Sequence, residues 1–331
     1  PVLTCWMGGF SMERSRELFQ NRGIATFATP ESAVEAFAAA ADYRANQQML
    51  LQVPEPLGER ERPDRDGAGL IIENALSERR NVLDVIESKA LLASFGIPIV
   101  RSTSAHDPSE ALALGEEIGF PLVMKINSPD ISHKSDVDGV RLGISNGREL
   151  QRAYHELMQR VEEHRPDARI RGVTLEPMWR PRNGREIMLG VVNDPVFGPA
   201  ITVGLGGTLV EVIRDRSVGL PPLNRFLARR MIERTRASRY LDEFRGKPPA
   251  DRRALEDVIL RLSDMVCELP AVEELDINPL VVNDTKAIAL DARVVVRRTN
   301  PSSFDYGHMA IHPYPSDLVS EHLLRDGTLV T

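Results

Sequence analysis

Glu274-Leu275-Asp276-Ile277-Asn278-Pro279-Leu280 and Ala287-Ile288-Ala289-Leu290-Asp291-Ala292 together predict a β-hairpin with polar side chains on one face. Asp276 and Asn278 lie two residues apart, and both point the same way because strand side chains alternate between the faces of a sheet. A turn at Asp284-Thr285 places Asn278 opposite Asp291. An amide and one or two carboxylates are therefore expected on one patch.

These side chains have the chemistry of a magnesium site, for which Asn278, Asp291 and Asp276 are the candidate ligands. Mg²⁺ binds few protein oxygens, keeps several waters and is often completed by the phosphates of a substrate. The pattern therefore favours nucleotide chemistry. The alternative is an exposed hairpin whose carboxylates contribute only to solubility.

The composition is that of a soluble globular protein with two or three domains. The 331 residues are 42% hydrophobic and 27% charged. A formal net charge of -7 argues against a nucleic-acid partner, because that affinity depends on Lys and Arg neutralising phosphates. The two cysteines, Cys5 and Cys267, are far apart and predict neither a disulfide framework nor a zinc site. This use of cysteine favours a reducing cytoplasm. With no apolar leader or membrane-spanning run, we expect that the protein does not cross a membrane.

The predicted elements are of the α/β and α+β classes. Residues 1–57 read as strand, Gly8-Gly9 turn, helix, strand and helix, which is part of a doubly wound unit. The glycine pair could bind a phosphate, although such pairs usually mark tight turns. Residues 54–68 have the composition of a linker, and the linker is predicted to span residues 58–80. Pro1 and Thr331 both lie in apolar runs, so we expect a piece of a longer polypeptide.

Residues 81–296 read as two lobes that divide near residues 178–184. The first lobe has a helix capped by Asp84 and Glu87, a helix capped by Asp107, and an aliphatic strand. Further expected elements are a helix at 148–164, strands at 172–176, 185–192, 200–203 and 209–213, and a helix that contains residues 255–265. Residues 297–331 lack periodicity and are expected to be a linker.

Lys125 lies within the aliphatic strand Leu122–Ile126. Burying an unpaired ammonium is costly, so its head must meet water, a carboxylate or a phosphate. The candidate metal site favours a phosphate, and the alternative is an edge-strand lysine that reaches solvent. The polar loop that follows, with His133 and Lys134, could close over a triphosphate. A loop histidine is usually solvated, yet beside a nucleotide it can act as base, acid or nucleophile.

Glu176 ends a predicted strand before Pro177-Met178-Trp179. Its carboxylate could accept hydrogen bonds from an exocyclic amine or ribose hydroxyls, and the residues after it could form an apolar slot for a base. Glu186 and Glu211 are further carboxylate candidates. Strand-end glutamates are more often ordinary surface residues.

Three groups of residues together resemble the ATP-grasp module of NDP-forming acyl-CoA synthetases, relatives of succinyl-CoA synthetase. They are Glu87-Ser88-Lys89-Ala90-Leu91-Leu92 with Gly96-Ile97-Pro98, then Lys125 with Ser128-Pro129-Asp130-Ile131-Ser132-His133-Lys134-Ser135-Asp136, and finally Asp276-Ile277-Asn278-Pro279-Leu280. The similarity runs from about residue 70 to residue 296. It implies a two-lobed ATP-grasp domain.

The flanking segments carry two further resemblances. Residues 1–57, with Trp6-Met7-Gly8-Gly9, resemble the latter part of a flavodoxin-like CoA-ligase domain. Residues 304–308 and 326–330 resemble the junction that leads into a GNAT domain in bifunctional bacterial protein lysine acetyltransferases. The acetyltransferase core would follow Thr331, so we do not expect this chain to acetylate a protein.

The resemblance also implies roles for individual residues. Lys125 would contact nucleotide phosphates, and Asn278 and Asp291 would bind Mg²⁺. His133 matches a histidine that transiently holds phosphate. The remaining candidates for ATP binding are Lys89, Lys134, Ser135, Glu176, Met178 and Glu186, of which Glu176 and Glu186 lie along the adenosine pocket. Asp138 departs from the family, whose loop ordinarily reads Gly-Gly, and its charge would hinder closure on phosphate.

Such enzymes convert an acid, CoA and ATP into acyl-CoA, ADP and phosphate through an acyl phosphate and a phosphohistidine. CoA or acyl-CoA would bind the intact protein, and an oligomer is possible. A second hypothesis is a module that senses nucleotide or acyl-CoA without turnover and regulates an acetyltransferase. A third, a stand-alone carboxylate–amine ligase, would leave the ligase-like residues 1–57 without a role.

Overall fold

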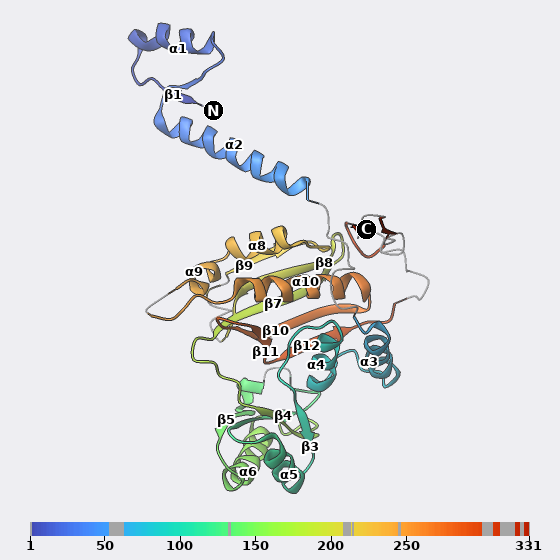
Figure 1. Cartoon of the computed structure of the whole chain (residues 1–331). Helices are drawn as coiled ribbons and strands as arrows, with labels where there is room; N and C mark the ends of the chain where they lie inside the picture. The colour runs from blue at the N-terminus through green and yellow to red at the C-terminus, as the bar shows by residue number, and fades with distance from the viewer. Residues whose placement is uncertain are drawn as a thin grey trace. The chain divides into compact units, whose positions relative to one another are not determined.

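The computed structural model describes residues 2–52, 63–131, 134–207, 213, 215–243, 246–299, 307–311, 322–324 and 328–330. The chain forms two compact units, Pro1–Val53 and Pro54–Thr331, both of which appear in Figure 1. In the described part of the chain, no helix is both long enough and apolar enough to span a bilayer.

The first unit has the predicted order of strand, helix, strand and helix. These elements are β1 (Leu3–Cys5), the short 3-10 helix η1 (Phe10–Met12), α1 (Glu13–Gln20), β2 (Ala25–Phe27) and α2 (Pro30–Leu50). The two strands pair in parallel, with Cys5 opposite Phe27. Helix α2 begins at Pro30, because the Thr29 hydroxyl caps it by accepting a hydrogen bond from the Ser32 amide and proline favours the first helical position.

The small lobe, residues 103–177, is a four-stranded antiparallel sheet in the order β3-β6-β4-β5. Its elements are β3 (Thr103–Ala105), α5 (Pro108–Ile118), β4 (Leu122–Asn127), η3 (Lys134–Val137), β5 (Val140–Ile144), α6 (Gly147–His164) and β6 (Gly172–Pro177). Helices α5 and α6 pack on the sheet (Figure 1) and bury Leu122, Met124 and Ile126 with Leu150 and Leu157. Burial of this apolar face holds the sheet on its helices.

The large lobe is built on a six-stranded sheet in the order β11-β10-β7-β8-β9, with β12 also paired to β10. Its strands are β7 (Arg185–Asp194), β8 (Gly198–Leu205), β9 (Arg216–Gly219), β10 (Val272–Val282), β11 (Ala287–Ala289) and β12 (Ala292–Val296). Its helices are α3 (Arg65–Ser77), α4 (Val85–Ser94), α8 (Arg225–Glu233), α9 (Ala237–Leu241) and α10 (Arg252–Glu268). The apolar face predicted for α10 is confirmed, since Leu255, Val258, Ile259, Leu262 and Met265 are buried.

The predicted linker at residues 58–80 is wrong for residues 65–77, which form α3. Its face of Ala68, Ile72 and Ala75 is buried in the large-lobe core. The charged residues of this segment concealed a helix with only a narrow apolar side. The strand predicted at residues 209–213 lies outside the described residues except for Ile213, and β3 and β9 were not predicted, because each is too short to show an alternating pattern.

The register predicted for the hairpin is confirmed on both sides of its polar patch. Leu280 pairs with Ala289, and Ile277 pairs with Ala292. Between these pairs the Leu290 amide donates to the Pro279 carbonyl at 3.0 Å, and β10 is irregular against β7 between Ile277 and Leu280. Such an irregularity redirects side chains locally. After residue 297, the described residues include an antiparallel pair, β13 (His322–Leu323) and β14 (Leu329–Val330).

Candidate functional site

Lys125 lies where the two lobes meet. Strand β4 has β6 on one side and β5 on the other, so the edge-strand interpretation of Lys125 is wrong, and the residue is only 8% exposed. Its ammonium lies 3.0 Å from Glu176 Oε2 within the small lobe. It also donates a 3.0 Å hydrogen bond to the carbonyl of Leu290 in the large lobe. This lysine therefore points at the segment that carries Asp291.

Glu176 is shared by two lysines. Lys89, on α4 and only 1% exposed, donates to Glu176 Oε1 at 2.8 Å and to the Ser102 hydroxyl at 2.8 Å. Ser102 in turn donates to Glu176 Oε1 at 2.7 Å. Both carboxylate oxygens are thus engaged, which differs from the expectation of an acceptor open to adenosine. The sequence carried no signal for Ser102, an isolated serine before a short strand.

The charges of this cluster influence one another. Burial lowers the pKa of Lys89, the nearby charge of Lys125 lowers it further, and Glu176 and Asp291 oppose these effects without reversing them. Buried ions need partners of opposite charge because they have lost water, and the Lys89–Glu176–Lys125 contacts supply them.

Asp291 follows β11 and faces several cations. Its Oδ2 lies 3.5 Å from the ammonium of Lys134, and its Oδ1 accepts a hydrogen bond from the Ala292 amide. Burial would raise the pKa of Asp291, but Lys125, Lys134 and Lys89 outweigh burial and hold it below the ordinary value. The carboxylate is therefore ionised at neutral pH.

Asn278 lies beside the glycine loop that follows β8. Its Oδ1 accepts a 3.0 Å hydrogen bond from the Gly207 amide. Gly207 has φ 81°, and a Cβ there would come within 2.3 Å of Glu186 Oε2. The positive φ therefore favours glycine at this position, whereas the flexible end of the Glu186 side chain could move to admit a Cβ. Glu186, which is exposed, and Asn278 thus both lie beside Gly207.

The donor set fits a divalent cation that phosphates complete. Asp291 is ionised, and Asn278 Oδ1 retains a second lone pair beyond its hydrogen bond to Gly207. Within the described ranges, no group of three or more His, Cys, Asp or Glu side chains could hold a metal alone. Two protein oxygens with ligand phosphates match the preference of Mg²⁺. Asp276 lies on β10, where it pairs with Gly190 and Arg293.

The remaining predicted residues are dispersed or outside the described structure. Met178 follows β6 and is partly buried, and its amide donates to the Pro121 carbonyl. The neighbouring Trp179 ring is covered by the Lys286 ammonium at 5.4 Å. Ser135 lies in η3, whereas His133 and Glu211 lie outside the described residues.

Asp138 has a positive φ of 52°, a conformation that glycine adopts most easily. Its carboxylate lies 3.6 Å from Arg160 on α6. The loop therefore holds an aspartate in a glycine-like backbone conformation and directs its charge toward an arginine.

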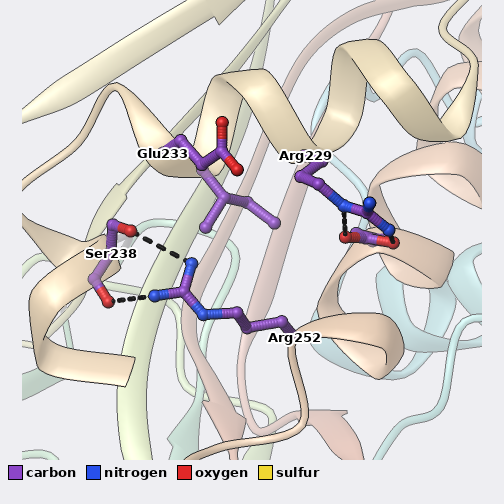
Figure 2. A pocket seen from close by; sticks show the side chains of 6 residues that line it. Arg229, Glu233, Ser238 and Arg252 are labelled. Carbon is purple, nitrogen blue, oxygen red and sulfur yellow. Dashed lines mark hydrogen bonds and ion pairs between the residues drawn. The ribbon is translucent and has the colours of Figure 1, made fainter. Parts of the chain in front are cut away.

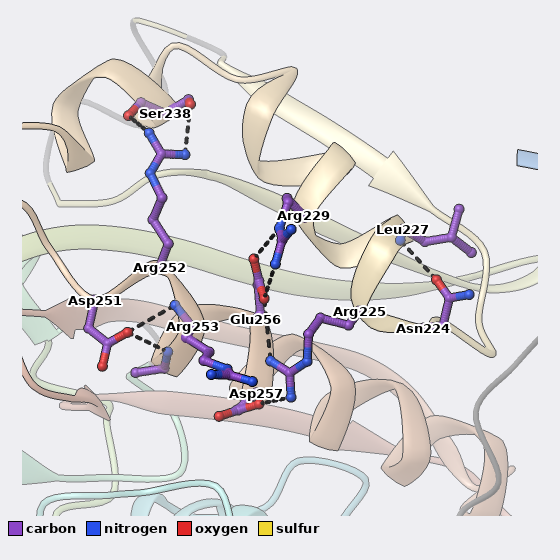
Figure 3. Close-up of polar contacts among 11 residues, drawn as sticks. Asn224, Arg225, Leu227, Arg229, Ser238, Asp251, Arg252, Arg253, Glu256 and Asp257 are labelled. Atoms are coloured by element: carbon purple, nitrogen blue, oxygen red, sulfur yellow. Dashed lines mark hydrogen bonds and ion pairs between the residues drawn. The ribbon is translucent and has the colours of Figure 1, made fainter. Parts of the chain in front are cut away.

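A cavity of about 320 Å³ lies between α8, α9 and α10 in the large lobe, away from these residues (Figure 2). Its arginines already have partners. Arg252 donates to Ser238 and Asp242, and Arg229 donates to Glu256. Arg225 joins the same carboxylate, so that two arginines enclose the buried Glu256 (Figure 3). These pairs connect α8 to α10 and explain the polar lining without a ligand.

The ion pairs among Lys89, Lys125, Lys134, Glu176 and Asp291 form a cluster between the lobes, here called the interlobe cluster. A smaller cavity of about 50 Å³ adjoins it. Its lining includes Asn127, Ser128 and Lys134 from the small lobe and Arg293 from the large lobe. Although this space is smaller than the one beside α8, it borders the ionised residues. The interlobe cluster is therefore the candidate site.

Known proteins resemble this chain in sequence and in fold. Residues 74–296 match the model of a family described as an ATP-grasp domain. The chain is 39% identical over 226 residues to the β subunit of the ADP-forming acetate–CoA ligase I of Pyrococcus furiosus, covering 68% of this chain and 96% of that subunit. It is 36% identical over 302 residues to the ADP-forming acetate–CoA ligase I of Archaeoglobus fulgidus, covering 89% of this chain and 42% of that protein.

A solved structure also matches. It is the dinucleotide-forming acetyl-coenzyme A synthetase 1 of Candidatus Korarchaeum cryptofilum in complex with coenzyme A, Ca-AMPCP and HgCl+. The identity is 35% and the TM-score is 0.67, covering 70% of this chain and all of the matched chain. The present chain thus spans nearly all of one relative's β subunit and less than half of the longer Archaeoglobus relative.

Proposed function

The chain belongs to the ATP-grasp domain family, and we propose that it binds Mg·ATP between its lobes as the nucleotide-binding part of an ADP-forming acyl-CoA synthetase. One observation carries the proposal: Lys125 of the small lobe reaches the carbonyl of Leu290, the residue next to the ionised Asp291 of the large lobe. A cation and an anion from different lobes thus border one site.

In this proposal the lysines serve the phosphates. Lys125 would donate hydrogen bonds to phosphate oxygens. Lys134, whose ammonium lies 3.5 Å from Asp291, would also contact the phosphates of a bound nucleotide. Asn278 and Asp291 would hold Mg²⁺, with Asp276 two residues along the same strand. The metal would neutralise charge on the phosphate oxygens. Met178 and Glu186 are proposed to border the nucleoside, and Ser135 the phosphates.

The complete reaction is proposed for the whole synthetase rather than for this chain alone. The synthetase would join an acid to CoA at the expense of ATP, with ADP and phosphate as products and His133 as the residue that transiently carries phosphate. Relatives occur both as separate β subunits and as longer chains. A GNAT acetyltransferase domain after residue 331 is proposed from the C-terminal sequence alone. A cytoplasmic location is proposed from the use of cysteine.

Binding measurements test the site. Lys125→Met and Asp291→Asn should each weaken Mg·ATP binding about tenfold or more, since a charge-assisted hydrogen bond contributes roughly 1.5–3 kcal/mol. Isothermal titration calorimetry measures the affinity, and thermal melts confirm folding. Two control variants change residues of the same types away from the site: Lys247→Met, at an exposed lysine, and Asp257→Asn, at a half-exposed aspartate paired with Arg225. Both should bind as the parent chain does. Unchanged affinity in both site variants would refute the proposal.

A second candidate function is nucleotide or acyl-CoA sensing without turnover, which requires the same pocket. Incubation of the full-length protein with Mg·ATP radiolabelled at the γ-phosphate separates the two. An acid-labile label that disappears in His133→Ala supports phosphoryl transfer. Measurable binding without a label favours sensing.

A further inference from the structure

We propose that Lys89 is a positioning residue, which engages Glu176 from behind and thereby keeps the ammonium of Lys125 available to a phosphate. The inference rests on the proposed function, in which Lys125 meets the nucleotide. It assigns Lys89 a role through Glu176 rather than a contact with the ligand.

The first step is geometric. Lys89 on α4 is 1% exposed, and its ammonium donates to Ser102 and to Glu176 Oε1, each at 2.8 Å. Glu176 presents its other oxygen, Oε2, to Lys125 at 3.0 Å. The carboxylate therefore separates the two ammonium groups, and Lys89 lies behind it.

The second step is the charge balance. Lys89, Glu176 and Lys125 together carry two positive charges and one negative charge, and the neighbouring pair of Lys134 and Asp291 adds one charge of each sign. The cluster therefore has one surplus positive charge. Without Lys89, Glu176 would neutralise Lys125 alone, and a phosphate would have to compete with a buried carboxylate for that ammonium.

The third step is orientation. Lys125 is held on one side by Glu176 and on the other by the Leu290 carbonyl, in the segment that carries Asp291. Glu176 is itself held by Lys89 and Ser102, which lie outside the small-lobe sheet. The position of α4 thus determines where Lys125 points, because an ordered chain of hydrogen bonds restricts each side chain in turn.

A charge-rescue experiment tests the role. Calorimetry should be carried out with Mg·ATP and with adenosine on the parent chain, Lys89→Met, Glu176→Gln and the double variant. Lys89→Met should weaken Mg·ATP binding about tenfold, because the surplus charge is lost. Glu176→Gln should bind as tightly or more tightly. The double variant should return to within about threefold of the parent affinity, since Lys125 again has no competing carboxylate.

The affinity for adenosine separates this role from a purely structural one, in which a variant would weaken the binding of adenosine and Mg·ATP alike. Adenosine lacks phosphates, so its affinity should change by less than about twofold in all these variants. Lys89→Arg keeps the charge and should retain Mg·ATP affinity within about threefold, which also covers the case in which Lys89→Met does not fold. Thermal melts establish folding for each variant.

Three results would overturn the inference: unchanged Mg·ATP affinity in Lys89→Met, a double variant as weak as Lys89→Met, or weaker binding in Glu176→Gln. Failure of the proposed function gives a different pattern. In that case the parent chain does not bind Mg·ATP, or Lys125→Met binds it normally. Binding that depends on Lys125 but shows no rescue defeats only the role of Lys89.

Discussion

Lys125 and Glu87 show how much a single charged residue can reveal. Lys125 lies among aliphatic neighbours in the sequence, which predicts a partner for its ammonium because an unpaired buried charge is costly. That the partner is Glu176, shared with Lys89, could not be read locally, because the three residues lie on α4, β4 and β6. Glu87 was easier to interpret, because its capping partner Asp84 lies three residues away.

Glu87 should contribute stability that depends on pH. Its carboxylate accepts from both terminal nitrogens of Arg80, at 2.7 and 2.8 Å, and from the Asp84 amide at 2.8 Å. Burial would raise the pKa of Glu87, but Arg80 and the Asp84 amide lower it overall from the ordinary 4.5. A lowered pKa in the folded state means stabilisation that is complete above pH 4.5 and is lost as pH falls through the folded value.

Urea unfolding of Glu87→Gln measures this contribution. The variant should be less stable than the parent chain near pH 7, and the difference in the free energy of unfolding should shrink at roughly pH 3. Glu78→Gln is a matched control, because Glu78 pairs with the same Arg80 but is 52% exposed. A difference that stayed constant between the two pH values would contradict the assigned cause.

At the scale of elements, local signals located the helix starts. Asp84 and Asp107 each accept hydrogen bonds from amides of the first helical turn. Caps act over three or four residues and are therefore readable in a sequence. Helix α3 was missed because its cap, Asp64, stands in a run of charged residues and its apolar face is narrow.

Two glycines of α3 should respond differently to alanine. A Cβ at Gly69 meets nothing within 4 Å, so Gly69→Ala should raise stability by up to about 1 kcal/mol through the lower entropy of the unfolded chain. A Cβ at Gly67 would lie 2.3 Å from Oδ2 of Asp64, whose Oδ1 accepts the capping hydrogen bond, so Gly67→Ala should displace this carboxylate and lose about 1 kcal/mol of capping.

Thermal unfolding of the two variants provides the measurement. They are matched in chemistry and lie in the same helix, so the sign of the difference isolates the cap. Equal gains in both would mean that Asp64 does not stabilise α3 through the Gly67 amide, from which it accepts a hydrogen bond at 2.9 Å.

At the scale of the whole molecule, each of the two compact units contains one cysteine. Cys267 is 2% exposed on α10 in the large lobe, whereas Cys5 is exposed in the first unit. Burial, together with Asp264 and Glu268, raises the pKa of the Cys267 thiol well above its ordinary value. The reactive thiolate is therefore scarce at neutral pH.

A disulfide reagent should consequently modify one thiol rapidly in the native protein and the second only as the large lobe unfolds. Cys5→Ser should remove the rapid phase and leave the slow one. If the chain binds Mg·ATP, saturating nucleotide should slow the second phase further, because ligand binding favours the folded state. Two rapid phases in the native protein would contradict the burial of Cys267.

Sequence alone determined the parts of this protein that depend on neighbours along the chain. These include the capped helices, the strand with Lys125, and the hairpin register that brings Asn278 and Asp291 onto adjoining segments. Resemblance of short motifs then predicted the ATP-grasp family, which the match over residues 74–296 confirms.

Only the tertiary structure decided how the charges are shared. It placed Lys89 behind Glu176, Lys125 against the Leu290 carbonyl and the Gly207 amide on Asn278. It also showed that the arginines lining the polar cavity beside α8 are paired with neighbouring residues of the same lobe. The physical reason is the range of the interactions. Helix caps and strand alternation act within a few residues, whereas the partner of a buried charge is set by which lobes pack together.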